Sequence, residues 1–138
     1  MRTAHAFGAS FFFSVNAARH LRETHLADTS KSSLHLPWYD WDAVAAMALP
    51  KGCSLVGVEL TDAAIELPAF RHPLNAAYVL GREKGDLSAE MIARCEHVVK
   101  IPTRFCLNVS LAGALVMYDR LIALGGYPPR PLMPGGPD

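Results

Sequence analysis

Apolar residues gather in four short continuous runs along the chain, which occupy residues 10–15, 54–60, 76–80 and 97–101. Within each run apolar residues follow one another instead of alternating with polar ones. Continuous apolar runs of this length are typical of parallel strands that are covered on both faces. The pattern therefore predicts four buried strands.

Segments with helical spacing and capping residues separate these runs. Ser88 is a suitable N-cap for one helix, and Asn108 for the longest one, which Gly125 and Gly126 would stop. The predicted helices are a short one ending at Gly8 and the segments 17–22, 42–48, 88–95 and 108–124. Alternating strands and helices predict an α/β fold, in which a parallel sheet is flanked by helices.

The chain has 138 residues, of which 51% are hydrophobic, and this size predicts one domain over residues 1–127. Residues 128–138 are rich in proline and glycine, so we expect a flexible tail there. The apolar start carries a single basic residue, Arg2, and is interpreted as core and not as a signal peptide. Charged residues interrupt every apolar run well before it could cross a bilayer, so no membrane is expected.

Charge and cysteine content narrow the functional classes. Thirteen basic and thirteen acidic residues give a net charge of zero, so RNA binding would have to use a local basic patch. The cysteines are Cys53, Cys95 and Cys106, an odd number without a C-x-x-C pair, which argues against disulfides and zinc and favours the cytoplasm. The six histidines lack ligand spacing, and we expect no metal site.

Two unusual loops follow the predicted strands at 76–80 and 97–101. In open α/β sheets, ligands bind beyond the carboxyl ends of the strands. The first loop, 80–88, has two glycines and a carboxylate between two bases, although a plain charged turn would be the commoner explanation. The second, 101–110, combines Ile101-Pro102 with Arg104 and leads into Asn108, which helix capping alone could explain.

These loops carry ordered motifs that resemble the SpoU/TrmH family of SPOUT-class RNA methyltransferases. Residues 80–85 read L-G-R-E-K-G and resemble the family pattern L-G-x-E-x-x-G, with one residue fewer between the glutamate and the last glycine. The pattern I-P…S-L-N-V-S-x-A…Y-E matches residues 101–119, with Cys106 in place of the first serine and Asp119 in place of the glutamate. Residues 2–8 resemble the end of the family's first motif, N-x-G-x-x-x-R-x-A-x-x-F-G, whose opening N-x-G and preceding strand would lie before Met1. The chain start is therefore expected to lack the family's N-terminal strand.

The resemblance implies a deep trefoil knot at the carboxyl end and S-adenosylmethionine as the cofactor, with S-adenosylhomocysteine as product. It implies a homodimer, in which the apolar positions Val109, Ala112, Leu115 and Val116 of the last helix divide between core and partner. The expected cofactor contacts are Leu80, Gly81, Glu83, Gly85, Ile101, Leu107 and Asn108.

The implied reaction is methylation of a ribose 2′-hydroxyl on transfer or ribosomal RNA, with Arg2, Asn108 and Ser110 as catalytic residues. Arginine has a pKa above about 12, so we expect Arg2 to position the hydroxyl and its phosphate and not to act as a base. The expected RNA contacts are Arg2, Arg19, Arg22, Arg82, Lys84 and Arg104. From position alone, a frayed terminal residue is the better explanation of Arg2, and a surface ion pair is the simplest explanation of Glu83; the motif favours the functional roles instead.

Two other interpretations compete with this one. Replacement of the motif serine by Cys106 fits a dimeric RNA- or cofactor-binding protein that has lost catalysis. The glycines of loop 80–88 would also suit an unrelated nucleotide-binding α/β domain, but the chain lacks G-K-[ST] and G-x-G-x-x-G signatures.

Overall fold

A computed structural model describes residues 1–17, 34–82 and 85–127. Its main elements are α1 (Arg2–Ala6), β1 (Phe12–Val15), β2 (Trp38–Trp41), β3 (Ser54–Val58), β4 (Ile65–Glu66), β5 (Ala76–Leu80), α3 (Ala89–Arg94), β6 (His97–Lys100) and α4 (Val109–Ala123), with short 3-10 turns η2 (Val44–Ala46) and η3 (Leu67–Ala69). Most of the helix predicted at 17–22 and the predicted tail lie outside the described residues.

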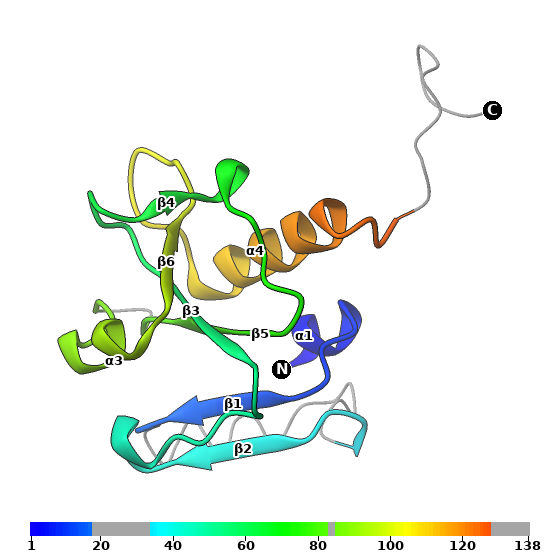
Figure 1. Ribbon diagram of the computed structural model, residues 1–138, viewed down its shortest axis with the longest axis vertical. Helices are drawn as coiled ribbons and strands as arrows, with labels where there is room; N and C mark the ends of the chain where they lie inside the picture. The colour runs from blue at the N-terminus through cyan, green and yellow to red at the C-terminus, as the bar shows by residue number, and fades with distance from the viewer. Residues whose placement is uncertain (18–33, 83–84, 128–138) are drawn as a thin grey trace.

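The strands form two parallel sheets (Figure 1). One has the order β4-β6-β3-β5 and the other pairs β1 with β2, and every strand pair is parallel. In the larger sheet Val56 of β3 lies opposite Tyr78 of β5. The parallel α/β architecture predicted from the apolar runs is thus confirmed, although as two sheets.

Helices α3 and α4 pack on opposite faces of the larger sheet. Val56 and Val99 share a buried cluster with Val116 of α4. The next residue along β3, Leu55, points to the other face and clusters with Met91 of α3. Successive side chains of a strand point to opposite faces, and both faces here are covered, which is why the strand sequences are continuously apolar.

Three elements differ from the prediction. Segment 42–48 forms only the turn η2, because Ala43 is extended, with φ −148° and ψ 158°. Pro50 also restrains the residue before it to extended backbone, which leaves too few residues for a stable helix. The strands β2 and β4 were not predicted: β2 contains Asp40 among aromatic residues and β4 has two residues.

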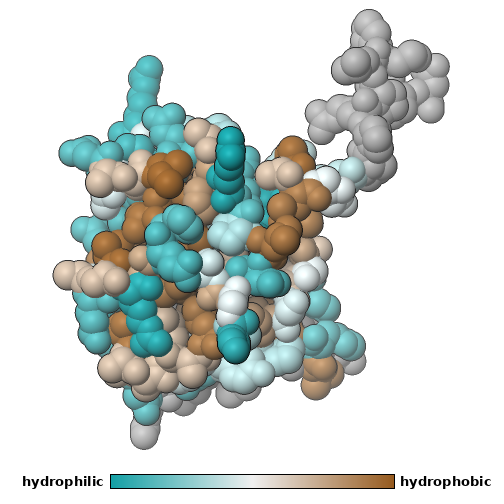
Figure 2. Space-filling model, viewed as in Figure 1, coloured by the Kyte–Doolittle hydropathy of each residue, from teal (hydrophilic) through white to brown (hydrophobic). Residues whose placement is uncertain are grey.

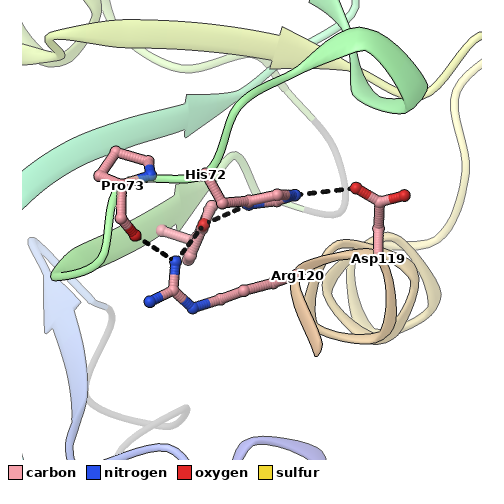
Figure 3. A network of polar contacts seen from close by, with 5 residues as sticks. His72, Pro73, Asp119 and Arg120 are labelled. Carbon is pink, nitrogen blue, oxygen red and sulfur yellow. Dashed lines mark hydrogen bonds and ion pairs between the residues drawn. The ribbon is translucent and has the colours of Figure 1, made fainter. Parts of the chain in front are cut away.

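A polar network fastens α4 to the segment before β5 (Figure 3). His72 lies between the Tyr78 hydroxyl, 2.6 Å from Nδ1, and the Asp119 carboxylate, 2.8 Å from Nε2. Arg120 donates to the carbonyls of Pro73 and Leu74, at 2.6 Å each, and to the Tyr78 oxygen at 3.1 Å. The His72 side chain is completely buried, so the network joins parts of the chain 47 residues apart inside the molecule.

Both ends of α4 follow the sequence signals. The Asn108 side chain accepts hydrogen bonds from the backbone N–H groups of Ser110 and Leu111, and Gly125 follows the last turn with φ +70°. Across the described part of the chain, no helix has the length and apolarity to cross a bilayer.

Candidate functional site

The carboxyl ends of β3, β5 and β6 meet at one edge of the larger sheet and surround a cavity of about 150 Å³. Parallel strands place their carboxyl ends together, which is why loops far apart in sequence converge there. Its lining consists of Val58, Glu59, Leu60, Leu80, Gly81, Arg82, Gly85, Asp86, Ile101, Thr103, Cys106, Leu107, Val109 and Ala112.

The loop after β5 forms one wall of this cavity through its backbone. A Cβ atom on Gly81 would lie 3.0 Å from the carbonyl oxygen of Gly85, closer than side-chain atoms normally come. Gly85 has φ +138°, a conformation that L side chains rarely adopt. The shape of the loop therefore favours glycine at both positions, 81 and 85.

Glu59, the residue after β3, ties this loop to the sheet. Its Oε2 accepts from the backbone N–H of Leu87 at 2.8 Å, and its Oε1 accepts from the N–H of Leu60 at 2.9 Å. Neither Glu59 nor Leu60 was predicted as a site residue. Glu59 lies within the run 54–60 that predicts a strand, so no local signal marked it as a site residue.

The loop after β6 forms the opposite wall. Thr103 closes a tight turn, since its N–H donates to the Ile101 carbonyl at 2.8 Å and its hydroxyl donates to the Phe105 carbonyl at 2.9 Å. The Phe105 side chain is 74% exposed beside the cavity. Cys106 is exposed and lines the cavity directly.

The structure brings most of the predicted cofactor contacts together. Leu80, Gly81, Gly85, Ile101 and Leu107 all line the cavity, and so does the predicted RNA contact Arg82. The predicted cofactor contact Glu83 lies outside the described residues, as do the predicted RNA contacts Arg19, Arg22 and Lys84.

The predicted catalytic residues do not share the cavity. Asn108 is absent from its lining, and its side-chain oxygen caps α4. Ser110 is exposed and lines a second, larger groove, and Arg2 is exposed on α1 and lines neither space. Arg104 is exposed in the loop after β6 without lining the cavity.

The larger groove has a volume of about 1480 Å³ and lies between β1 and β5, with α1 and α4 along its sides. It shares residues 80–82, 85, 86 and 109 with the smaller cavity. A cavity of about 150 Å³ is small, since ligand sites usually measure roughly 300–1,000 Å³. A cofactor-sized ligand would therefore extend from the cavity into the groove.

Burial shifts the ionisation of three groups near the core. It raises the pKa of the Cys53 and Cys95 thiols and of the Tyr78 hydroxyl, which Arg120 partly offsets at Tyr78. Neither thiol is thus prepared as a nucleophile. The described residues contain no cluster of three or more His, Cys, Asp or Glu side chains suited to a metal ion.

The chain thus has an α/β fold with a candidate ligand site at the carboxyl edge of its larger parallel sheet. The chain belongs to the SpoU rRNA Methylase family, whose model matches residues 1–118. A curated relative, the mouse tRNA (guanosine(18)-2′-O)-methyltransferase TARBP1, is 31% identical over 72 residues, which are 50% of this chain and 5% of the mouse protein.

Solved structures share the fold. The SpoU methyltransferase AviRb from Streptomyces viridochromogenes, in complex with AdoMet, gives a TM-score of 0.75 at 22% identity over 91% of this chain and 54% of AviRb. The A. aeolicus TrmH/SpoU tRNA modifying enzyme gives 0.67 at 17% identity, over 91% of this chain and 66% of that enzyme. The chain thus spans a small part of the mouse relative and about half of AviRb.

Proposed function

We propose that this chain binds S-adenosylmethionine and transfers its methyl group to RNA, at a ribose 2′-hydroxyl of transfer or ribosomal RNA. The observation that carries the proposal is the cavity at the ends of β3, β5 and β6, lined by the residues of two family motifs. The family membership supports it, and so does the fold likeness to AviRb, which binds AdoMet.

The residues around the cavity suit this cofactor. Gly81 and Gly85 allow a ligand to approach the backbone closely, and Leu80, Ile101 and Leu107 offer an apolar surface. When bound, the cofactor supplies a methyl group on a positively charged sulfur. Glu83 and Asn108 remain proposed contacts, Asn108 through groups other than the oxygen that caps α4.

Arg2 is proposed to hold the phosphate next to the target ribose and so align the hydroxyl, with Asn108 and Ser110 assisting. Alignment of this kind is a main source of catalytic rate. Because Arg2 is exposed and does not line the cavity of its own chain, we propose that it serves the cavity of a second copy.

An exposed apolar stripe on α4 supports a homodimer. Leu111, Leu115, Tyr118 and Ile122 are spaced along one side of the helix and are 51, 38, 41 and 53% exposed. Apolar side chains reach the surface near the carboxyl end of α4 in Figure 2. A contiguous exposed apolar face typically marks an interaction site. Leu115, which was predicted to divide between core and partner, lies on this stripe, whereas Val116 is buried.

The RNA surface is proposed to surround the cavity. Arg82 and Arg104 lie on its two opposite loops, and the exposed Phe105 offers a ring on which a base can stack. Arg2 would add to it from the partner, and Arg19, Arg22 and Lys84 remain proposed contacts. The trefoil knot and a cytoplasmic location also remain proposals.

Methyl transfer to total RNA from cells lacking the gene tests the activity, with labelled cofactor and nuclease mapping of the product. No transfer by a protein that binds S-adenosylhomocysteine would favour the second candidate, a binding protein without catalysis. The observation favouring that candidate is Cys106 in the cavity wall where the family has serine. In that case, Cys106→Ser should create methyl-transfer activity. Methyl transfer by the wild type would exclude a binding protein without catalysis.

Mixing two inactive variants tests the shared site. The Arg2→Ala chain has an intact cavity, and the Gly81→Val chain has an intact Arg2. In a mixed dimer, the cavity of the first chain and the arginine of the second therefore form one complete site. At equal mixing we expect about a quarter of the wild-type activity, because half of the dimers are mixed. No methyl transfer by the mixture would show that Arg2 acts within its own chain or has no role in the reaction.

A further inference from the structure

The loop after β5 is anchored at its end by a residue that no motif contains. Glu59 follows β3, and its Oε2 accepts from the N–H of Leu87, 28 positions later, at 2.8 Å. Its Oε1 accepts from the N–H of Leu60 at 2.9 Å. Both carboxylate oxygens therefore hold backbone, one at the end of β3 and one at the end of the loop.

The Leu87 side chain also anchors the end of this loop, through apolar packing. It packs against the cluster that contains Leu55 and Met91, and its Cδ1 would lie 3.3 Å from a Cβ built on Gly57. At the other end the loop leaves β5 at Leu80, a paired residue of the sheet. Between these anchors the backbone doubles back, so that Gly81 lies against the carbonyl of Gly85.

We infer that Glu59 is a positioning residue for the cofactor loop: by holding the Leu87 amide, it keeps Gly81, Gly85 and Asp86 in the arrangement that receives S-adenosylmethionine. This inference rests on the proposed function. A loop held in its bound shape loses less conformational freedom on binding, so the ligand binds more tightly. Glu59 also lines the cavity, so its anchor lies at the site itself.

The geometry requires a carboxylate of this length. Glutamine has one acceptor oxygen, and its NH₂ group would face the second backbone N–H, donor against donor. Aspartate keeps the charge but is one methylene shorter and cannot reach both amides. A positioning role therefore predicts that both substitutions weaken cofactor binding, whereas a role of charge alone predicts that only glutamine does.

Calorimetric titration of S-adenosylhomocysteine into the full chain tests this inference. The variants are Glu59→Gln and Glu59→Asp, with Glu96→Gln as the control, because Glu96 accepts from Ser54 Oγ at 2.9 Å at the opposite end of β3. We expect both Glu59 variants to bind about tenfold more weakly and the control to bind like the wild type. Amide exchange at Leu87 should accelerate in the Glu59 variants alone.

Kinetics separate positioning from loss of fold. We expect the KM for S-adenosylmethionine to rise about tenfold and kcat at saturating cofactor to stay within about twofold, since a bound cofactor orders the loop by itself. Wild-type affinity in either Glu59 variant would overturn the inference, as would equal weakening in Glu96→Gln. Should one Glu59 variant not fold, the other decides the question. A wild type that does not bind S-adenosylhomocysteine would refute the proposed function instead.

Discussion

Removing the Asp119 carboxylate tests whether the buried network holds α4 in place. The donors and acceptors fix the direction of each hydrogen bond. Arg120 can only donate to the Tyr78 oxygen, and a carboxylate can only accept, so His72 must donate from Nε2 to Asp119. In the tautomer whose only ring N–H is on Nε2, Nδ1 accepts from the Tyr78 hydroxyl, and both ring nitrogens then have a partner.

The cost of Asp119→Ala follows from the burial of His72. Its side chain is 0% exposed, so the N–H left without an acceptor cannot turn to water. An unsatisfied buried donor costs about 1–3 kcal/mol. We expect a loss of about 2 kcal/mol, which for a domain of this size lowers Tm by about 8 °C. Affinity for S-adenosylhomocysteine should change little, because neither His72 nor Asp119 lines the cavity or the larger groove.

Urea unfolding followed by circular dichroism measures this loss, and a double-mutant cycle assigns it to the pair. In a His72→Phe background the buried donor is gone, so Asp119→Ala should then cost less than about 0.5 kcal/mol. Asp62→Ala, an exposed aspartate on another loop, is the control. Equal losses from Asp119→Ala in both backgrounds would refute the assignment of the network.

Three further results are expected. Gly81→Ala should weaken S-adenosylhomocysteine binding about tenfold in calorimetry, because the new Cβ would lie 3.0 Å from the Gly85 carbonyl; unchanged affinity would show that the loop yields. Iodoacetamide labelling followed by mass spectrometry should modify exposed Cys106 before Cys53 and Cys95, whose pKa values burial raises, and S-adenosylhomocysteine should protect Cys106. Burial raises the pKa of Tyr78 above its ordinary 10.0, so its stabilising contribution is complete below that pH and is lost as pH rises through the folded-state pKa. Urea unfolding from about pH 9 to about pH 11 should therefore show a smaller loss of stability for Tyr78→Phe than for the wild type.

Local sequence signals were sufficient for the elements around the site. The strand predicted at 76–80 is β5 to the residue, and Ser88 caps α3 as predicted, accepting from the Met91 N–H. These elements have continuous apolar runs or capping side chains, and both signals can be identified from neighbouring residues in the sequence. The two loops that line much of the cavity were located in the same way, because each directly follows a predicted strand.

Elements held by distant partners were missed. β2 is a strand through its pairing with β1, in which Trp38 lies opposite Phe12, and the Trp38 indole donates to Ser14 Oγ at 3.0 Å. Aromatic residues beside Pro37 gave no local sign of this pairing. Glu59 was missed likewise, since its partner Leu87 is distant in sequence and a lone carboxylate after a strand has many uses.

The proposed site has two parts that would depend differently on assembly. The cavity is built from strand ends of one chain, so S-adenosylhomocysteine binding should be independent of protein concentration. Arg2 lies outside that cavity, so methyl transfer should require the second copy that the apolar stripe on α4 is proposed to bind. Specific activity should therefore fall on dilution below the dimer dissociation constant, while binding per chain stays constant. Leu115→Glu, which places a charge on the stripe, should give a monomer that binds the product and transfers nothing. Full activity in a monomer shown by light scattering would mean that one chain carries the whole site.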